Sequence, residues 1–373
     1  MHFAFTDEQE DLRRTVRTLL DRRGGPDVPP PEAPAAAHDA ALWARMAEQI
    51  GTHGLAVPEE HGGSGAGLVE ALIVVEELGR RLVTSPYLGS AVLCSQVLLA
   101  AGDPGAAARL LPGIASGGSV AALAWAEQEH RWDTSACAAL ARRDGDRWLL
   151  TGRKLFVLDG AEADVLLVVA TTGTRPSLFE VDPGALPHAR TDAVPMDPTR
   201  RWTGFTFHDA PARLIGAAGG AEPALARCRD VAAAALAAEQ VGAAQRWLGE
   251  TVEYTKVREQ FGRPIGSFQA LKHRLADLFV AVESARSMSW AASWAVAHRT
   301  EQAAEWAAMA KSYCSETYAA VAAEGVQLHG GLGITWEHEA HLHLKRAHSS
   351  AQLFGTPRDH RRRLEAALLR ARP

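Results

Sequence analysis

Three long helical segments in the second half of the chain constrain its fold more than any other feature. Residues 226–257, 267–297 and 300–326 are rich in alanine, and only short connections separate them. Long helices joined by short loops run antiparallel and bury their apolar faces against one another. The sequence therefore predicts a helical bundle over residues 226–373.

The sequence pattern is different in the residues before this predicted bundle. Short β-type runs such as ADVLLVVATT and WTGFTFHDA fill residues 118–225, and turn sequences such as DGD and DPTRR separate them. Residues 1–117 are helical in pattern, with Thr6 as an N-cap and a helix that ends at Gly51. The Pro/Ala-rich stretch GGPDVPPPEAPAAA between them predicts an exposed loop. We expect a mainly α protein with a central β domain, divided at 1–117, 118–225 and 226–373.

Charge and cysteine usage exclude several classes of protein. The formal net charge of −5 disfavours nucleic-acid binding, which requires a basic surface. No stretch resembles a signal peptide or approaches the roughly 20 apolar residues of a membrane span. The four cysteines are far apart and predict free thiols in a reducing compartment, and they are Cys94, Cys137, Cys228 and Cys314. A cytoplasmic protein is therefore expected.

Four motifs carry a resemblance to a known family. They are GLAVPEEHGGSG (54–65), VVEELGR (74–80), VREQFGRPIGSFQALKHRLADL (257–278) and AAEGVQLHGGLGITWEHE (322–339). With the order of the domains, they make the chain resemble an acyl-CoA dehydrogenase along nearly its whole length. The resemblance implies an N-terminal helical domain, a small β-barrel or sandwich and a C-terminal four-helix bundle.

The resemblance also implies a reaction. In that family FAD lies at a subunit interface, a buried glutamate removes the α-proton of an acyl-CoA thioester, and FAD accepts hydride from the β-carbon. Burial raises the pKa of a carboxylate and makes it a stronger base. Electron-transfer flavoprotein is the expected acceptor of the electrons.

Residues that the family uses to contact the flavin of a neighbouring subunit are present. Arg258 matches the arginine that binds the FAD pyrophosphate, and Phe261 matches the aromatic residue beside the adenine. Gln269, Gln327 and Gly331 match the rest of this arm. The resemblance thus implies that this chain contributes to a flavin site in trans.

By contrast, several residues that the family uses to contact the flavin of the same subunit are replaced in this chain. The family's Thr-Glu-Pro-Gly-Ala-Gly-Ser-Asp loop aligns with AEQEHRWD (126–133), where Ala126, Gln128 and Trp132 replace Thr, Pro and Ser. In the segment that covers the flavin ring, Leu158 replaces a hydroxyl residue, and leucine cannot donate a hydrogen bond. These losses suggest that the flavin place of this subunit is empty.

The catalytic base of the family is also missing. Its commonest position corresponds to Phe354 and its alternative position to Ala232. Thr356, in the Gly-Thr that follows Phe354, is either a flavin contact or part of a turn. Glu239 lies seven residues after Ala232, which returns it to nearly the same helix face about 10 Å further along. It is a weak candidate for a base, and a buried structural acid is the alternative.

The histidines of GITWEHEAHLHLKR (333–346) resemble metal ligands, but no matching set of carboxylates is evident in the sequence. We expect no metal site. The pattern as a whole predicts the base-lacking subunit of an α2β2 acyl-CoA dehydrogenase, similar to actinobacterial enzymes that act on steroid side-chain CoA thioesters. Its partner would be a homologous, base-containing subunit. The alternatives are a self-sufficient homo-oligomeric flavoenzyme with a non-standard base, or a non-catalytic binding protein.

Overall fold

The structure is a computed structural model that describes residues 5–23, 37–127, 132, 137–186, 190–192 and 194–370. The chain forms two compact units. One comprises Met1–Pro26, Leu72–Val83 and Ala233–Pro373, and the other comprises Asp27–Ala71 and Thr84–Ala232. The Pro/Ala-rich stretch lies outside the described residues, apart from the exposed Ala37. Because the units group residues by packing, the division into three domains stays a prediction.

The first helix begins where the sequence predicts. In α1 (Asp7–Arg23) the Thr6 hydroxyl accepts a hydrogen bond from the backbone N–H of Gln9 at 3.3 Å, and the Gln9 side chain accepts one from the N–H of Thr6 at 3.0 Å. This reciprocal capping confirms Thr6 as the N-cap. Arg17 joins α1 to α3 (Leu68–Arg80), because its guanidinium donates to both carboxylate oxygens of the buried Glu77, at 2.6 and 2.9 Å.

The remaining N-terminal helices are short. They are α2 (Ala40–Arg45), α4 (Ser95–Ala100) and α5 (Pro104–Ala115). One wider helical turn, Met46–Ile50, extends α2, and another, Leu88–Cys94, leads into α4. The first of these turns ends at Gly51, whose φ of 72° is left-handed, so the predicted end of the helix is confirmed.

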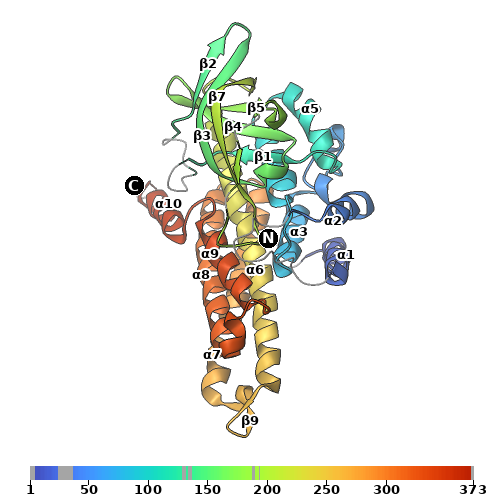
Figure 1. The fold of residues 1–373 in the computed structure, drawn as a ribbon, viewed down its shortest axis with the longest axis vertical. Helices are drawn as coiled ribbons and strands as arrows, with labels where there is room; N and C mark the ends of the chain where they lie inside the picture. Colours follow the sequence, from blue (N-terminus) through green and yellow to red (C-terminus); the bar gives the residue numbers. More distant parts are fainter. Residues whose placement is uncertain are drawn as a thin grey trace. The chain divides into compact units, whose positions relative to one another are not determined.

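The central β segment closes on itself. Strand β4 pairs with β2, β2 with β3, β3 with β7, β7 with β5, and β5 with β4, which gives a small barrel. The short strands β1 and β6 add to β4 and β7, and Figure 1 shows these strands in green. The bounds are β1 (Ala121–Ala124), β2 (Leu140–Asp144), β3 (Arg147–Leu158), β4 (Val165–Thr172), β5 (Arg175–Val181), β6 (Arg190–Asp192) and β7 (Trp202–Ile215).

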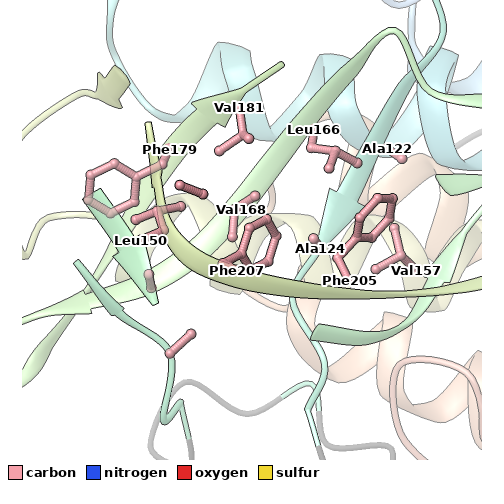
Figure 2. Close-up of a cluster of buried hydrophobic side chains, with 13 residues drawn as sticks. Ala122, Ala124, Leu150, Val157, Leu166, Val168, Phe179, Val181, Phe205 and Phe207 are labelled. Carbon is pink, nitrogen blue, oxygen red and sulfur yellow. The ribbon is translucent and has the colours of Figure 1, made fainter. Parts of the chain in front are cut away.

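Alternating side chains of these strands fill the barrel. Figure 2 shows Phe207 of β7 beside Val168 of β4, and Phe205 of β7 beside Val157 of β3, in one buried cluster. The two phenylalanines are separated by one residue, so both face the interior of the barrel. The predicted central β domain is therefore confirmed as a closed barrel with its own apolar core.

The C-terminal helices form the predicted bundle, drawn from yellow to red in Figure 1. Helix α7 packs against α8, and α8 packs against α9 and α10. Close approach of α6 to α8 depends on Gly325, because a Cβ there would lie 2.0 Å from Nε1 of Trp247. None of the described helices is long and apolar enough to cross a membrane. The bounds are α6 (Glu222–Val257), α7 (Gln269–Ala297), α8 (Ala303–His329), α9 (Ala340–Gln352) and α10 (Pro357–Arg370).

Candidate flavin and acyl-CoA site

A short hairpin at the end of α6 carries two of the expected flavin contacts. Arg258 directly follows α6, and β8 (Glu259–Gln260) pairs with β9 (Arg263–Pro264). The two residues between the strands, Phe261 and Gly262, have φ values of 56° and 74°. Two successive positive φ values are typical of the tight turn whose twist matches a hairpin. The hairpin therefore projects from the end of the bundle with Phe261 at its tip.

Contacts within the chain do not explain the backbone conformation and the exposure of Phe261. Its side chain is 90% exposed, and a bulky residue with positive φ is strained. Among the described residues, its ring contacts only Phe268, edge-on with centroids 6.1 Å apart, and Arg263 lies over the ring of Phe268 at 4.0 Å. A strained and exposed aromatic side chain suggests a ligand or partner outside this chain.

The other expected contacts are exposed too. Arg258 is exposed and has no ion-pair partner among the described residues. Gln269 opens α7, Gln327 lies in the last turn of α8, and Gly331 follows α8 with open space where a Cβ would lie. All of these positions belong to one compact unit and are accessible. They fit a flavin held from outside this chain's own core.

A stack of four rings supports this arm from within the bundle. Tyr254 lies on His329 with ring centroids 4.2 Å apart, His329 lies 5.0 Å from Trp247, and Trp247 lies 4.7 Å from His343. Neighbouring rings are within 23° of parallel. His329 directly precedes the turn that carries Gly331, so the stack fixes that turn against α6. The sequence pattern did not reveal this stack, because its members are up to 96 residues apart.

The chain's own flavin positions are filled with apolar groups. Leu158, at the end of β3, is buried, as are Ala126 and Trp132. Gln128 lies outside the described residues. None of the three described side chains at these positions carries a hydroxyl, so they do not fit the hydrogen-bonding role that the resemblance assigns to them.

Asp159, which sequence reasoning missed, follows Leu158 with a positive φ of 56°. Its carboxyl is buried, and Oδ2 has no hydrogen-bond partner among the described residues. Burial, and then the nearby Glu162 carboxylate, raise the pKa of Asp159 to about 7. The only sequence signal was an acidic residue directly after a buried strand.

Both family positions for the base are buried and apolar. Phe354 lies in the loop between α9 and α10 with φ 52°, and its carbonyl oxygen is 3.1 Å from Nε2 of His360. Ala232 is fully buried in α6. Thr356 caps α10, because its hydroxyl donates to the Asp359 carboxylate at 2.6 Å and accepts from the Asp359 N–H at 3.2 Å. Thr356 therefore stabilises the start of α10. Its contact with a flavin stays a prediction.

Glu239 is buried and paired. Its carboxylate accepts hydrogen bonds from Arg346 at 3.2 Å and from the Ser350 hydroxyl at 2.8 Å, both on α9. Gly79 of α3 lies against it, since a Cβ there would be 2.7 Å from Cγ of Glu239. An arginine partner stabilises the ionised carboxylate and makes it a weaker base. The geometry therefore favours the structural alternative, while the role of Glu239 stays untested.

Outside these positions, the described residues contain one group that could hold a metal ion. It comprises Glu250 of α6, Glu339 just before α9, and His343 of α9. Two of these three residues come from the histidine-containing stretch 333–346, and Glu250 comes from a helix about 90 residues upstream.

Comparisons with known proteins show the family of the chain. Models of the N-terminal and C-terminal domains of acyl-CoA dehydrogenases match residues 6–118 and 220–369. Acyl-CoA dehydrogenase IpdE2 of Mycobacterium tuberculosis (strain ATCC 25618 / H37Rv) is 42% identical over 363 residues, which cover 96% of this chain and 97% of that protein.

Two solved structures extend the comparison. A chain of the ChsE4–ChsE5 complex from Mycobacterium tuberculosis superposes with a TM-score of 0.88 and 28% identity, over 100% of both chains. A chain of a variant of the Tcur3481–Tcur3483 steroid ACAD gives a TM-score of 0.85 and 29% identity, over 98% of both chains. The chain therefore belongs to the acyl-CoA dehydrogenase family, whose cofactor is FAD.

Proposed function

We propose that this chain is the base-lacking subunit of an acyl-CoA dehydrogenase and completes the flavin site of a base-containing homologue in an α2β2 assembly. One observation carries the proposal. The arm that begins at Arg258 is exposed, whereas both base positions, Phe354 and Ala232, are buried and cannot accept a proton.

Each side of the assembly would then have a distinct task. This chain's residues would hold and orient the cofactor: Arg258 would pair with the pyrophosphate by charge-assisted hydrogen bonds, and Phe261 would lie along the adenine. FAD, when bound, supplies the redox chemistry. The partner would supply the carboxylate that removes the α-proton of the acyl-CoA thioester.

The surface of the bundle supports a macromolecular partner. Large apolar side chains are exposed near the arm and along α7, and burying them on a partner would be favourable. They are Val257, Phe261, Phe279, Val280 and Ile334.

The relatives support the finer identity. ChsE4–ChsE5 and Tcur3481–Tcur3483 are complexes of two named chains, and the second is a steroid ACAD. We infer a steroid-derived acyl-CoA as the substrate class, electron-transfer flavoprotein as the acceptor, and the cytoplasm as the location.

A self-sufficient flavoenzyme is the competing proposal, with Glu239 as its base. The ion pair with Arg346 and the buried Leu158 both disfavour it, because the first weakens the base and the second cannot hydrogen-bond a flavin. The third possibility, a binding protein without catalysis, would give no reason for an intact arm.

Arg258→Ala tests the trans arm. We expect this variant to lower the FAD content of the purified assembly, measured by flavin absorbance per protein, because a charge-assisted contact is lost. Lys256→Ala is the matched control, since Lys256 is an exposed cation two residues away whose partner is Glu253. An unchanged FAD content in Arg258→Ala, with the assembly intact, would refute the assignment of the arm.

A further inference from the structure

Of the two ring nitrogens of His343 on α9, one has a hydrogen-bond partner among the described residues and the other has none. Its Nδ1 lies 2.9 Å from the hydroxyl oxygen of Tyr318, and the side chain is fully buried. Nε2 has no hydrogen-bond partner among the described residues. A buried polar atom without a partner is rare in folded proteins, and an ion or a water is the usual explanation.

Two carboxylates lie beside the imidazole of His343. One oxygen of Glu250, one oxygen of Glu339 and a ring nitrogen of His343 all lie within 4.8 Å of one another. Glu250 is exposed and Glu339 is half-buried, so the group opens from the buried imidazole toward solvent. A metal ion could therefore reach the group from outside.

Arg246 orients both carboxylates. Its Nε donates to Oε1 of Glu250 at 2.7 Å, and its Nη2 donates to Oε2 of Glu339 at 2.9 Å. Its Nη1 donates to the backbone carbonyl of Arg80 at 3.2 Å, which holds the guanidinium in place. Arg246 bonds one oxygen of each carboxylate, so the second oxygen of each remains available as a ligand. The single positive charge of Arg246 balances one of the two carboxylates, which leaves a net charge of −1 for these three side chains. Outer hydrogen bonds of this kind commonly orient metal ligands.

We propose that His343 Nε2, Glu250 and Glu339 bind a divalent first-row metal ion such as Zn²⁺, with water as a further ligand. Imidazole nitrogen and carboxylate oxygen are ordinary ligands of this ion. Tetrahedral zinc ligands are about 3.3 Å apart, given bond lengths of about 2 Å. Because the three ligand atoms already lie within 4.8 Å of one another, reaching this spacing would need each separation to shorten by at most about 1.5 Å, and the exposed Glu250 side chain can move.

The hydrogen bond on the other side of the ring suits this role. Nδ1–H can donate a hydrogen bond to the Tyr318 hydroxyl, and this tautomer leaves the lone pair on Nε2 free to bind an ion.

The proposed ion would be structural. It would join α6, through Glu250, to the start of α9, through Glu339 and His343. His343 also stacks on Trp247, and that stack continues to His329 at the base of the turn that carries Gly331. The inference concerns stability and does not depend on the proposed dehydrogenase function.

Zinc binding to untagged, full-length protein tests the inference. The protein would be treated with EDTA, dialysed, and titrated with ZnCl₂ in a calorimeter, with metal retained after gel filtration measured by mass spectrometry. We expect one Zn²⁺ per chain and a higher melting temperature. Glu250→Gln should abolish both effects while retaining the native circular dichroism spectrum.

Glu253→Gln is the matched control, because Glu253 is an exposed glutamate on the same helix outside the group. It should bind zinc as the wild type does. Glu339→Gln provides a second variant if Glu250→Gln fails to fold. Equal zinc binding by the folded ligand variants and the wild type, or no stoichiometric zinc in the wild type, would overturn the inference.

Discussion

Asp159 illustrates how one residue can make stability depend on pH. Its pKa is about 7 in the folded protein, against an ordinary value of 3.8. Between these values the folded protein binds a proton that the unfolded chain has lost, so its stability falls as the pH rises. The stabilisation is complete below the unfolded pKa and is lost as the pH passes the folded pKa.

Asp159→Asn should remove this dependence. We expect the variant to raise the free energy of unfolding by about 2–4 kcal/mol at pH 8 and hardly at all at pH 4, because a pKa unit corresponds to about 1.4 kcal/mol. Melting temperatures across this pH range provide the measurement. Asp209→Asn is the control, since Asp209 also has a positive φ (49°) but is exposed. A variant that melts like the wild type at pH 8 would contradict a destabilising effect of the buried, ionised Asp159 carboxyl.

Glu239→Gln separates a structural acid from a base. We expect a loss of about 3 kcal/mol in the free energy of unfolding, because Arg346 would remain buried without its anion. Dehydrogenation by the assembled enzyme should stay within about tenfold of wild type, which is about 1.4 kcal/mol of activation free energy. Chemical denaturation and the rate of flavin reduction are the two measurements.

The double variant Glu239→Gln/Arg346→Gln should regain part of the lost stability, because neither charge is then buried alone. Loss of several orders of magnitude in flavin reduction by Glu239→Gln, with folding intact, would instead identify Glu239 as the base and this chain as a complete catalyst.

At the scale of elements, the hairpin between α6 and α7 has a strained turn, and the proposed flavin contact of Phe261 would explain why that strain is kept. Its turn requires positive φ at Phe261, where asparagine is a favoured residue and phenylalanine is not. Phe261→Asn should therefore raise the melting temperature slightly and lower the FAD content of the assembly. Gly262→Ala, at φ 74°, should lower both. An unchanged FAD content in Phe261→Asn would show that the exposed ring has no role in flavin binding.

The helices of the bundle could be predicted because the sequence patterns that indicate them lie within each helix or directly beside it. The expected helix 226–257 is α6 (Glu222–Val257), and the expected helix 267–297 is α7 (Gln269–Ala297). Alanine content, turn residues and short connections are sufficient for such predictions. The third helix extends to His329, three residues beyond the expected end, because the glycines that stop it come later.

The details of the site depend on contacts that no local pattern encodes. The pair of Glu239 and Arg346 joins residues 107 positions apart, and the backbone N–H of Asp159 is held by the carbonyl oxygen of Arg201. The absence of a metal site was expected because no carboxylates matched the histidines. Glu250 became visible as a candidate ligand only when α6 was placed beside α9.

At the scale of the whole molecule, the proposed function makes this chain half of an active site. Its arm is exposed and its two base positions are apolar. On that proposal, flavin binding and proton abstraction both require another subunit. Expressed alone, the chain should be poorly soluble or free of flavin, because apolar surface stays exposed.

The stoichiometry of FAD in the co-purified assembly tests this claim most directly. A tetramer of identical chains is symmetric and offers four equivalent flavin sites if it offers any. With a base-containing homologue, we predict an α2β2 assembly with one FAD per heterodimer, measured by flavin absorbance and native mass spectrometry. A homotetramer of this chain that carries four FAD and oxidises an acyl-CoA would contradict the account.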